Sequence, residues 1–127
     1  GRKRDVAAHY DRALQSIEGV SPPYVPPGYL HSYQSYLVTL PEGTDRDGLL
    51  RAMSDRGISC RHGIAPMHFE PYYRELFGNV HLPVTESISA RTMFLPIYPQ
   101  MTPAETDFVV ESLAALLPRH LRATRRP

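Results

Sequence analysis

The side chains that could do chemistry gather in one stretch, the seventeen residues from Gly57 to Tyr73 (GISCRHGIAPMHFEPYY). This stretch holds one cysteine, one arginine, two histidines and two tyrosines, and two prolines constrain its path. Loops mounted on a rigid scaffold carry a large share of binding and catalytic groups, so a functional site is expected here. Metal binding, nucleophilic catalysis and anion binding are the three chemistries that these residue types allow.

Metal binding has four possible ligands within eleven residues: Cys60, His62, His68 and Glu70. Structural zinc sites usually add a second Cys or His pair at short spacing elsewhere in the chain. This sequence has no such pair, although the fold could bring His31 or His81 to the group. We therefore expect no metal site.

Nucleophilic catalysis would need Cys60 and a histidine in hydrogen-bond contact. In an extended segment Cys60 and His62 share one face but point side by side, and a buried inert cysteine is the commoner outcome. No glycine-rich loop precedes a helix, as phosphate-binding fingerprints require. What remains is a polar loop in which Arg61 can bind an anion and His62 or His68 can hydrogen-bond.

The elements that must position this loop follow from hydrophobic periodicity and from helix-start and helix-stop residues. In chain order the sequence predicts a helix over Asp5–Glu18, an extended proline-rich connector over Gly19–Gly28, a strand over Leu30–Leu40, a short helix ending at Gly57, a strand over Ile58–His62, helices over Glu70–Phe77 and Pro83–Ala90, a strand over Arg91–Tyr98, and a helix from Pro103 to Leu117. Three strands with helices on one face make a small two-layer α/β domain.

Several side-chain directions follow from these elements. The first helix should bury a stripe formed by Val6, Tyr10, Ala13, Leu14 and Ile17. In the first strand, Tyr36, Val38 and Leu40 should face one side and Tyr33 and Leu37 the other, with the polar first half of the strand at a rim. In the helix that follows the candidate loop, Tyr73, Leu76 and Phe77 should point inward. Pro96 makes the last strand an edge strand or a strand end.

Three helix ends carry recognisable signals. Thr44 is placed to cap the short helix, since Asp47 follows three residues later. Gly57 fits the left-handed residue after that helix, and Ile58 should then touch Met53. Thr102 and Glu105 form a capping box at the start of the last helix.

The bulk composition points to one globular domain. The chain has 127 residues, 42% hydrophobic and 21% charged, enough apolar material for a core.

The basic N-terminus GRKRD lacks an apolar stretch after it, so we expect no signal peptide. The lone Cys60 suits a reducing compartment, so we expect a cytoplasmic location. The segment from Asp5 to Pro118 holds seven basic and thirteen acidic residues, a formal charge of −6. An acidic body argues against nucleic-acid binding, and no run is long enough for a membrane span. The basic residues near the two ends, including Arg125 and Arg126, are interpreted as solvated termini.

Four segments, in order, resemble the C-terminal part of the DegT/DnrJ family of pyridoxal-phosphate-dependent sugar aminotransferases. RKRDVAAHYDRAL resembles the family's helix between the large and small domains, and HSYQSYLVTL resembles its first small-domain strand, with Thr39 where an arginine is often found. RDGLLRAMSDRGISCR, followed by PMH and PYY, resembles its helix, Gly-Ile turn and Pro-x-His loop. FLPIYPQMTPAETDFVVESL resembles its closing strand and helix.

The resemblance implies an interdomain helix over residues 1–19 and a small α/β domain over residues 20–127. It implies a large N-terminal domain, a homodimer, the cofactor pyridoxal phosphate, and transfer of an amino group from glutamate to a nucleotide-linked keto sugar. Arg61 would bind a substrate carboxylate or phosphate, with a surface salt bridge as the alternative. His68 would contact the substrate, with a structural histidine as the alternative. Tyr33 and Gln34 are further candidates.

Transamination needs a lysine to form a Schiff base with the cofactor. The only lysine is Lys3, in a charged terminus, so we expect no catalytic residue here, no covalently bound cofactor, and an inactive fragment. The alternative is a free-standing α/β domain that binds a partner without chemistry. A fragment should expose a large apolar surface, whereas a free-standing domain should not.

Overall fold

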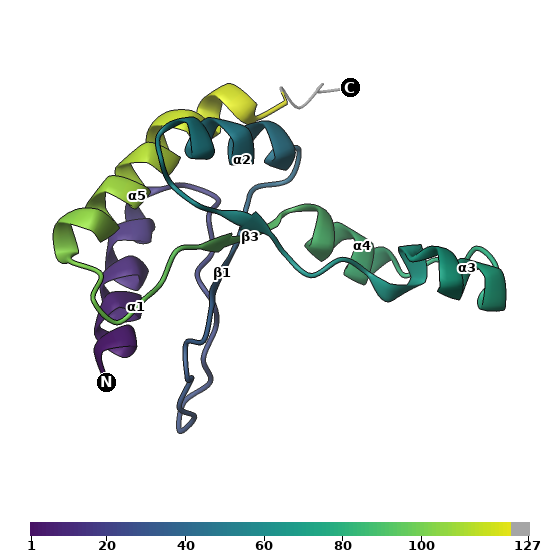
Figure 1. Ribbon diagram of the computed structural model, residues 1–127, viewed down its shortest axis with the longest axis horizontal. Coiled ribbons are helices and arrows are strands. Elements are labelled where there is room, and N and C mark those ends of the chain that lie inside the picture. Colours follow the sequence, from purple (N-terminus) through teal and green to yellow (C-terminus); the bar gives the residue numbers. More distant parts are fainter. Residues whose placement is uncertain (123–127) are drawn as a thin grey trace.

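Three short antiparallel strands form the centre of the fold (Figure 1). The computed structural model describes residues 1–122. β1 (Tyr36–Thr39) and β2 (Arg61–His62) both pair with β3 (Thr92–Leu95), so the strand order is β1-β3-β2. The predicted three-stranded α/β fold is confirmed.

Helices cover one face of this sheet. α1 (Arg2–Ala13) packs against α5 (Pro103–Leu116), and α5 packs against α2 (Arg46–Asp55). Figure 1 shows all three to the left of and above the strands. The core between the two layers is made of fully buried side chains from α1, α2, α5, β1 and β3 and from residues next to them, among them Tyr10, Leu14, Tyr36, Val38, Leu40, Leu49, Met53, Met93 and Leu113. Both residues of β2 are exposed. The two-layer arrangement is therefore as predicted.

Two tyrosines fasten the first helix to the sheet. The rings of Tyr10 and Tyr36 lie 4.8 Å apart between centroids. The hydroxyl of Tyr10 donates to the carbonyl of Pro96 (2.8 Å), and that of Tyr36 donates to the carboxylate of Asp11 (2.5 Å). Both buried hydroxyls thus have an acceptor, as buried polar groups require. The predicted stripe on the first helix is buried here, within the chain itself, with Ala13 packed at its margin.

The ends of α2 and α5 confirm two of the predicted signals and correct a third. Thr102 and Glu105 make both hydrogen bonds of a capping box. At the end of α2, Gly57 has a φ of 78° and the amide of Ile58 donates to the carbonyl of Met53 (3.1 Å), the bond of a Schellman ending. The prediction that Thr44 caps α2 is wrong. The cap is the next residue, Asp45, whose carboxylate accepts from the amide of Gly48, while the Thr44 hydroxyl donates to the carbonyl of Pro41.

The first strand is shorter than predicted. Tyr33 has a φ of 50°, a left-handed conformation that a strand cannot continue through. Pairing therefore begins only at Tyr36, and residues 22–35 form a long loop that extends downward in Figure 1. At its start, Ser21 and Thr39 exchange two backbone hydrogen bonds of 2.9 and 3.0 Å along the outer edge of β1.

The last strand lies at the centre of the sheet. The prediction of an edge strand over Arg91–Tyr98 is wrong, whereas the alternative of a strand end at Pro96 is correct. β3 stops at Leu95, one residue before the proline, so all its ladder positions keep their amide donors. A central strand followed directly by proline has the same sequence pattern as an edge strand.

Residues 63–90 form an arm that projects from the body at the right of Figure 1. It contains α3 (Pro71–Phe77), α4 (Pro83–Ala90) and the short turn Met67–Phe69, and none of these three holds a buried residue. The prediction that Leu76 and Phe77 point inward is wrong, since their exposed fractions are 55% and 68%. Tyr73 is half-buried, with its ring stacked on Phe77 (6.4 Å between centroids). The rings of Tyr73 and Phe77 contact each other, and no part of the core lies beneath them.

Within the described residues, each helix is too short or too polar to cross a lipid bilayer.

Candidate functional site

Two of the four predicted site residues meet at an open hollow at one end of the sheet. Arg61 and Gln34 both line this hollow of about 500 Å³, which we call the Arg61 hollow. Its other lining residues come from the loop before β1, from the chain before β2 and from β3 with its continuation: Ser35, Ser59, Phe94, Leu95, Pro96, Ile97 and Tyr98. One guanidinium, several hydroxyls and an aromatic wall suit it to a polar, anionic ligand.

Arg61 stands on the sheet face opposite the helices. It is directly opposite Phe94 in the register, and Phe94 is opposite Leu37 on β1, so these three side chains share one face. The side chain of Arg61 is exposed. Among residues 1–122 it has no ion-pair partner. The alternative of a surface salt bridge is not seen in this part of the chain, so the guanidinium is available to a ligand.

Gln34 reaches the hollow from a loop that the first helix holds in place. The ammonium of Lys3 donates to the backbone carbonyl of Gln34 (3.2 Å), and Arg4 donates to the carbonyl of His31 (3.4 Å). The side chain of Gln34 remains exposed at the hollow. Two long basic side chains of α1 therefore set the position of one wall of the site.

Tyr33 lies beside this wall and does not line the hollow. Its ring stacks on Tyr36 (6.1 Å between centroids) and packs on His31 (4.4 Å), and its amide donates to Nδ1 of His31 (2.8 Å). Burial, and then the nearby charge of Asp11, raise the pKa of the Tyr33 hydroxyl. The geometry gives Tyr33 a packing role at the base of the loop.

Cys60 and His62 do not form a catalytic pair. Cys60 is packed against the core, and burial raises the pKa of its thiol to about 12. His62 is exposed, with Nδ1 2.9 Å from the carbonyl of Gly63. A thiol that stays protonated near neutral pH is a poor nucleophile and a poor metal ligand. Across residues 1–122, no three His, Cys, Asp or Glu side chains are grouped so that they could hold a metal ion.

His68 lies in a different place, in the arm. It lines a second hollow of about 500 Å³, the arm hollow, together with the apolar side chains of Met67, Tyr73, Phe77, Val80 and Leu82 and with Thr85. Nε2 of His68 is 3.0 Å from Oε1 of Glu86 on α4. The structure therefore separates His68 from the hollow that holds Arg61 and Gln34, and gives it a carboxylate partner eighteen residues away in sequence.

Sequence reasoning missed two residues that matter at these hollows. Tyr98 lines the Arg61 hollow, and its hydroxyl donates to Glu105 (3.0 Å), which raises the pKa of Tyr98. The capping box was a usable signal for Tyr98. It fixes the Glu105 carboxylate at the start of α5, and that carboxylate accepts the hydrogen bond from Tyr98. Glu86 was also missed. Its position in the first turn of a helix opened by Pro83 was the only hint.

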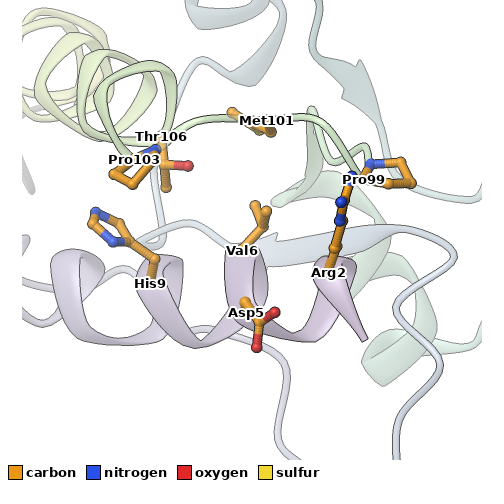
Figure 2. A pocket seen from close by; sticks show the side chains of 8 residues that line it. All are labelled: Arg2, Asp5, Val6, His9, Pro99, Met101, Pro103 and Thr106. Carbon is orange, nitrogen blue, oxygen red and sulfur yellow. The ribbon is translucent and has the colours of Figure 1, made fainter.

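A third hollow, of about 240 Å³, lies between α1 and the start of α5 (Figure 2). Arg2, Asp5 and His9 border it from the helix, and Met101, Pro103 and Thr106 from the opposite side. Nε2 of His9 lies 2.6 Å from Oδ1 of Asp107, the residue after Thr106 on α5. None of the predicted site residues lines this hollow, so it is a separate feature.

Comparison with known proteins identifies what the chain is similar to. The model of the DegT/DnrJ/EryC1/StrS aminotransferase family matches residues 1–114. Among solved structures, the aminotransferase TlmJ from Streptoalloteichus hindustanus is 28% identical, with a TM-score of 0.81 over 93% of this chain. DesV from S. venezuelae, solved in complex with a ketimine intermediate, is 25% identical, with a TM-score of 0.79 over 92% of this chain.

A third solved structure, PseC from Helicobacter pylori, an aminotransferase involved in the biosynthesis of pseudoaminic acid, shares the fold at 18% identity, with a TM-score of 0.85 over 93% of this chain. The alignments cover 31% of the TlmJ and DesV chains and 32% of the PseC chain. This chain therefore spans about a third of the length of the proteins that it matches.

Proposed function

Because the chain belongs to the DegT/DnrJ/EryC1/StrS aminotransferase family, we propose that it is the C-terminal small domain of a pyridoxal-phosphate-dependent sugar aminotransferase. The match over residues 1–114 is the observation that carries this proposal. The complete enzyme transfers an amino group from glutamate to a nucleotide-linked keto sugar, acts as a homodimer, and works in the cytoplasm, a location that suits a chain with a single cysteine. Residues 1–19 connect this domain to a large N-terminal domain.

The residues of this chain do not by themselves fit the cofactor. A Schiff base needs a lysine whose amine is held in a pocket. The only lysine is Lys3, near the start of α1. Its ammonium donates to the backbone carbonyl of Gln34. None of the three hollows described above has Lys3 in its lining. We therefore assign the cofactor and the catalytic lysine to the large domain.

What this chain contributes is substrate binding. Arg61 binds a carboxylate or phosphate through its planar fork of donors, and Gln34 offers an amide to the same ligand across the Arg61 hollow. Ser35, Ser59 and Tyr98 add hydroxyls, which suit a sugar or a ribose. His68 contacts the substrate from the arm once the large domain is in place.

The arm supports the existence of a covering domain. Its exposed apolar side chains are Ile64, Met67, Phe69, Tyr72, Leu76, Phe77, Val80, Leu82, Val84 and Ile88. An apolar surface of this extent marks an interaction site in a folded protein, and the matched relatives have about twice as much additional chain as this one spans. We assign the exposed apolar side chains of the arm that do not line the arm hollow to the contact with the large domain. This feature speaks against the alternative of a free-standing domain with a polar surface.

The test compares two proteins: this chain alone, and the complete enzyme expressed from its whole reading frame. Each is incubated with pyridoxal phosphate. The complete enzyme should keep the visible absorbance of a cofactor–lysine Schiff base after desalting and should aminate a nucleotide-linked keto sugar with glutamate. This chain alone should do neither. A Schiff base on this chain that survives desalting would overturn the assignment of the cofactor. A reading frame that starts near Gly1 would overturn the whole proposal.

A further inference from the structure

We propose that Glu86 is a positioning residue for His68. Its carboxylate holds the imidazole in the tautomer that carries the proton on Nε2, and so leaves Nδ1 as the acceptor that a ligand meets. This inference rests on the proposed function, in which His68 contacts the substrate. It adds a residue of α4 that lies eighteen positions from His68 in the sequence and that no motif pointed to.

The hydrogen bonds around Glu86 converge on a single oxygen. Its Oε1 lies 3.0 Å from Nε2 of His68, 3.1 Å from Nδ1 of His81 and 2.9 Å from the amide nitrogen of Leu82. An ionised carboxylate can only accept hydrogen bonds, so each of the three nitrogens must carry a proton. A neutral His68 is therefore protonated on Nε2, and its Nδ1 has a free lone pair.

Glu86 is ionised near neutral pH. The amide of Leu82, followed by the hydrogen bonds from His68 and His81, lowers the pKa of Glu86 to about 2. The carboxyl is therefore charged when histidines are neutral, and a neutral histidine beside it gains by donating.

The two histidines bonded to Glu86 differ in exposure. The less exposed one is the histidine that the carboxylate holds in place. The side chain of His81 is 86% exposed, whereas that of His68 is 10% exposed and that of Glu86 21%. Partial exclusion of water strengthens the bond between His68 and Glu86. His68 also packs on the ring of Phe69 (4.5 Å between centroids), over which Arg74 lies (5.5 Å). Its ring is thus held on one edge by Glu86 and on one side by Phe69.

His68 has a ligand-facing side in this arrangement. It lines the arm hollow, whose other residues are apolar except Thr85. Among residues 1–122, no hydrogen-bond partner is found for its Nδ1. A fixed acceptor selects a ligand group that donates, such as a sugar hydroxyl or an ammonium, because a ligand that covers Nδ1 without donating to it would leave the acceptor unpaired. Without Glu86, the ring could present either a donor or an acceptor.

The first measurement is the tautomer of His68 in the complete enzyme, read from its ring nitrogen resonances by NMR at alkaline pH. The wild-type enzyme should show the Nε2–H form alone, with a ring N–H protected from exchange with water. A mixture of tautomers, or the Nδ1–H form, would overturn the proposal without the need for any variant.

Variants then assign the effect to Glu86. Glu86→Ala should give a mixture of tautomers and a rapidly exchanging ring proton, while the amide resonances of β1 and β3 stay in place. Glu86→Gln keeps one acceptor oxygen and should retain the Nε2–H form. Glu75→Ala, which removes an exposed carboxylate of α3, is the matched control and should match the wild type. An unchanged Nε2–H form in Glu86→Ala would overturn the proposal.

Kinetics of the complete enzyme separate this inference from the proposed function. His68→Ala and Glu86→Ala should each lower kcat/KM by roughly tenfold, the value of about one hydrogen bond, and the double variant should lose no more than either one. Losses that multiply would overturn the positioning role. If the tautomer depends on Glu86 but His68→Ala keeps full activity, the positioning stands and the substrate role of His68 fails.

Discussion

Arg61 supplies the positive charge of the candidate site, and its place on β2 explains why it is available. It projects from the face of the sheet opposite the helices, beside Phe94, and within residues 1–122 no carboxylate pairs with it. Among the described residues that line the Arg61 hollow, Arg61 alone carries a charge. Gln34 and Tyr98 complete the polar rim of the same hollow.

Removal of this charge should weaken substrate use by the complete enzyme. We expect Arg61→Ala to lower kcat/KM by about 10- to 100-fold, since a hydrogen bond to a charged group contributes about 1.5–3 kcal/mol. Arg61→Lys should recover only part of the loss, because an ammonium cannot make the two parallel bonds of a guanidinium. Steady-state kinetics with both substrates would measure this. Arg51→Ala, on the exposed side of α2, is the control, and equal losses in both alanine variants would contradict the assignment.

Cys60 should react slowly with thiol reagents in the folded chain. Burial raises the pKa of its thiol to about 12, so the thiolate is scarce below that pH and increases as the pH rises towards it. At about pH 8 we expect modification about a hundredfold slower than in urea, after allowance for the greater intrinsic reactivity of a more basic thiolate. Timed reaction with a chromogenic disulfide, with and without urea, would test this. Equal rates would show that the thiol is not buried.

At the scale of elements, a close approach between the residue after β2 and the first residue of β3 fixes where the candidate loop leaves the sheet. The amide of Gly63 donates to the carbonyl of Thr92 (3.0 Å), and a Cβ on Gly63 would lie 2.2 Å from Oγ1 and 3.0 Å from Cβ of Thr92. Thr92 is buried, so its side chain has little room to move. Glycine is needed here for lack of space.

Gly63→Ala should therefore destabilise the domain by about 1–3 kcal/mol, the usual cost of overpacking a buried site. Urea unfolding followed by circular dichroism would measure the loss. In a Thr92→Ala background the nearest clashing atom is gone, so the same substitution should cost less, with a coupling of at least about 0.5 kcal/mol. Strictly additive effects of the two substitutions would show that the contact is not the cause.

At the scale of the whole molecule, the body and the arm differ in how they bury apolar side chains. α1, α2 and α5 enclose a core with the sheet, whereas the helices of the arm have no buried residue. An exposed apolar surface is the prediction for a fragment, and ten of the sixteen large apolar side chains that are exposed in the described residues lie in residues 63–90. The stripe on the first helix, by contrast, is buried against the sheet and α5, as predicted.

The isolated chain should self-associate through the arm. At concentrations of tens of micromolar we expect light scattering to show dimers or larger species, because large exposed apolar patches bind one another. Phe77→Glu and Val84→Glu, at positions 68% and 78% exposed, should shift the chain towards the monomer. Tyr24→Glu, at an 82% exposed position on the connector, should not. A wild-type chain that stays monomeric would favour a free-standing domain.

The sequence alone determined the elements whose signals are local. The capping box at Thr102 and Glu105, the glycine ending of α2 and the alternating burial of Tyr36, Val38 and Leu40 depend on neighbours a few residues away. Backbone hydrogen bonding and side-chain periodicity act over that range, so their patterns are written into the chain. The family resemblance has the same origin, in ordered local motifs.

Where distant groups meet depends on the tertiary structure. It put β3 at the centre of the sheet, brought Gln34 to Arg61, moved His68 away from them to Glu86, and left Leu76 and Phe77 without a core. Such contacts join segments separated by many residues, and their energies depend on what packs between them, which no local pattern encodes. The arm shows the limit most directly: its helices have the apolar sequence of buried elements, yet in the described part of the chain they contain no buried residue.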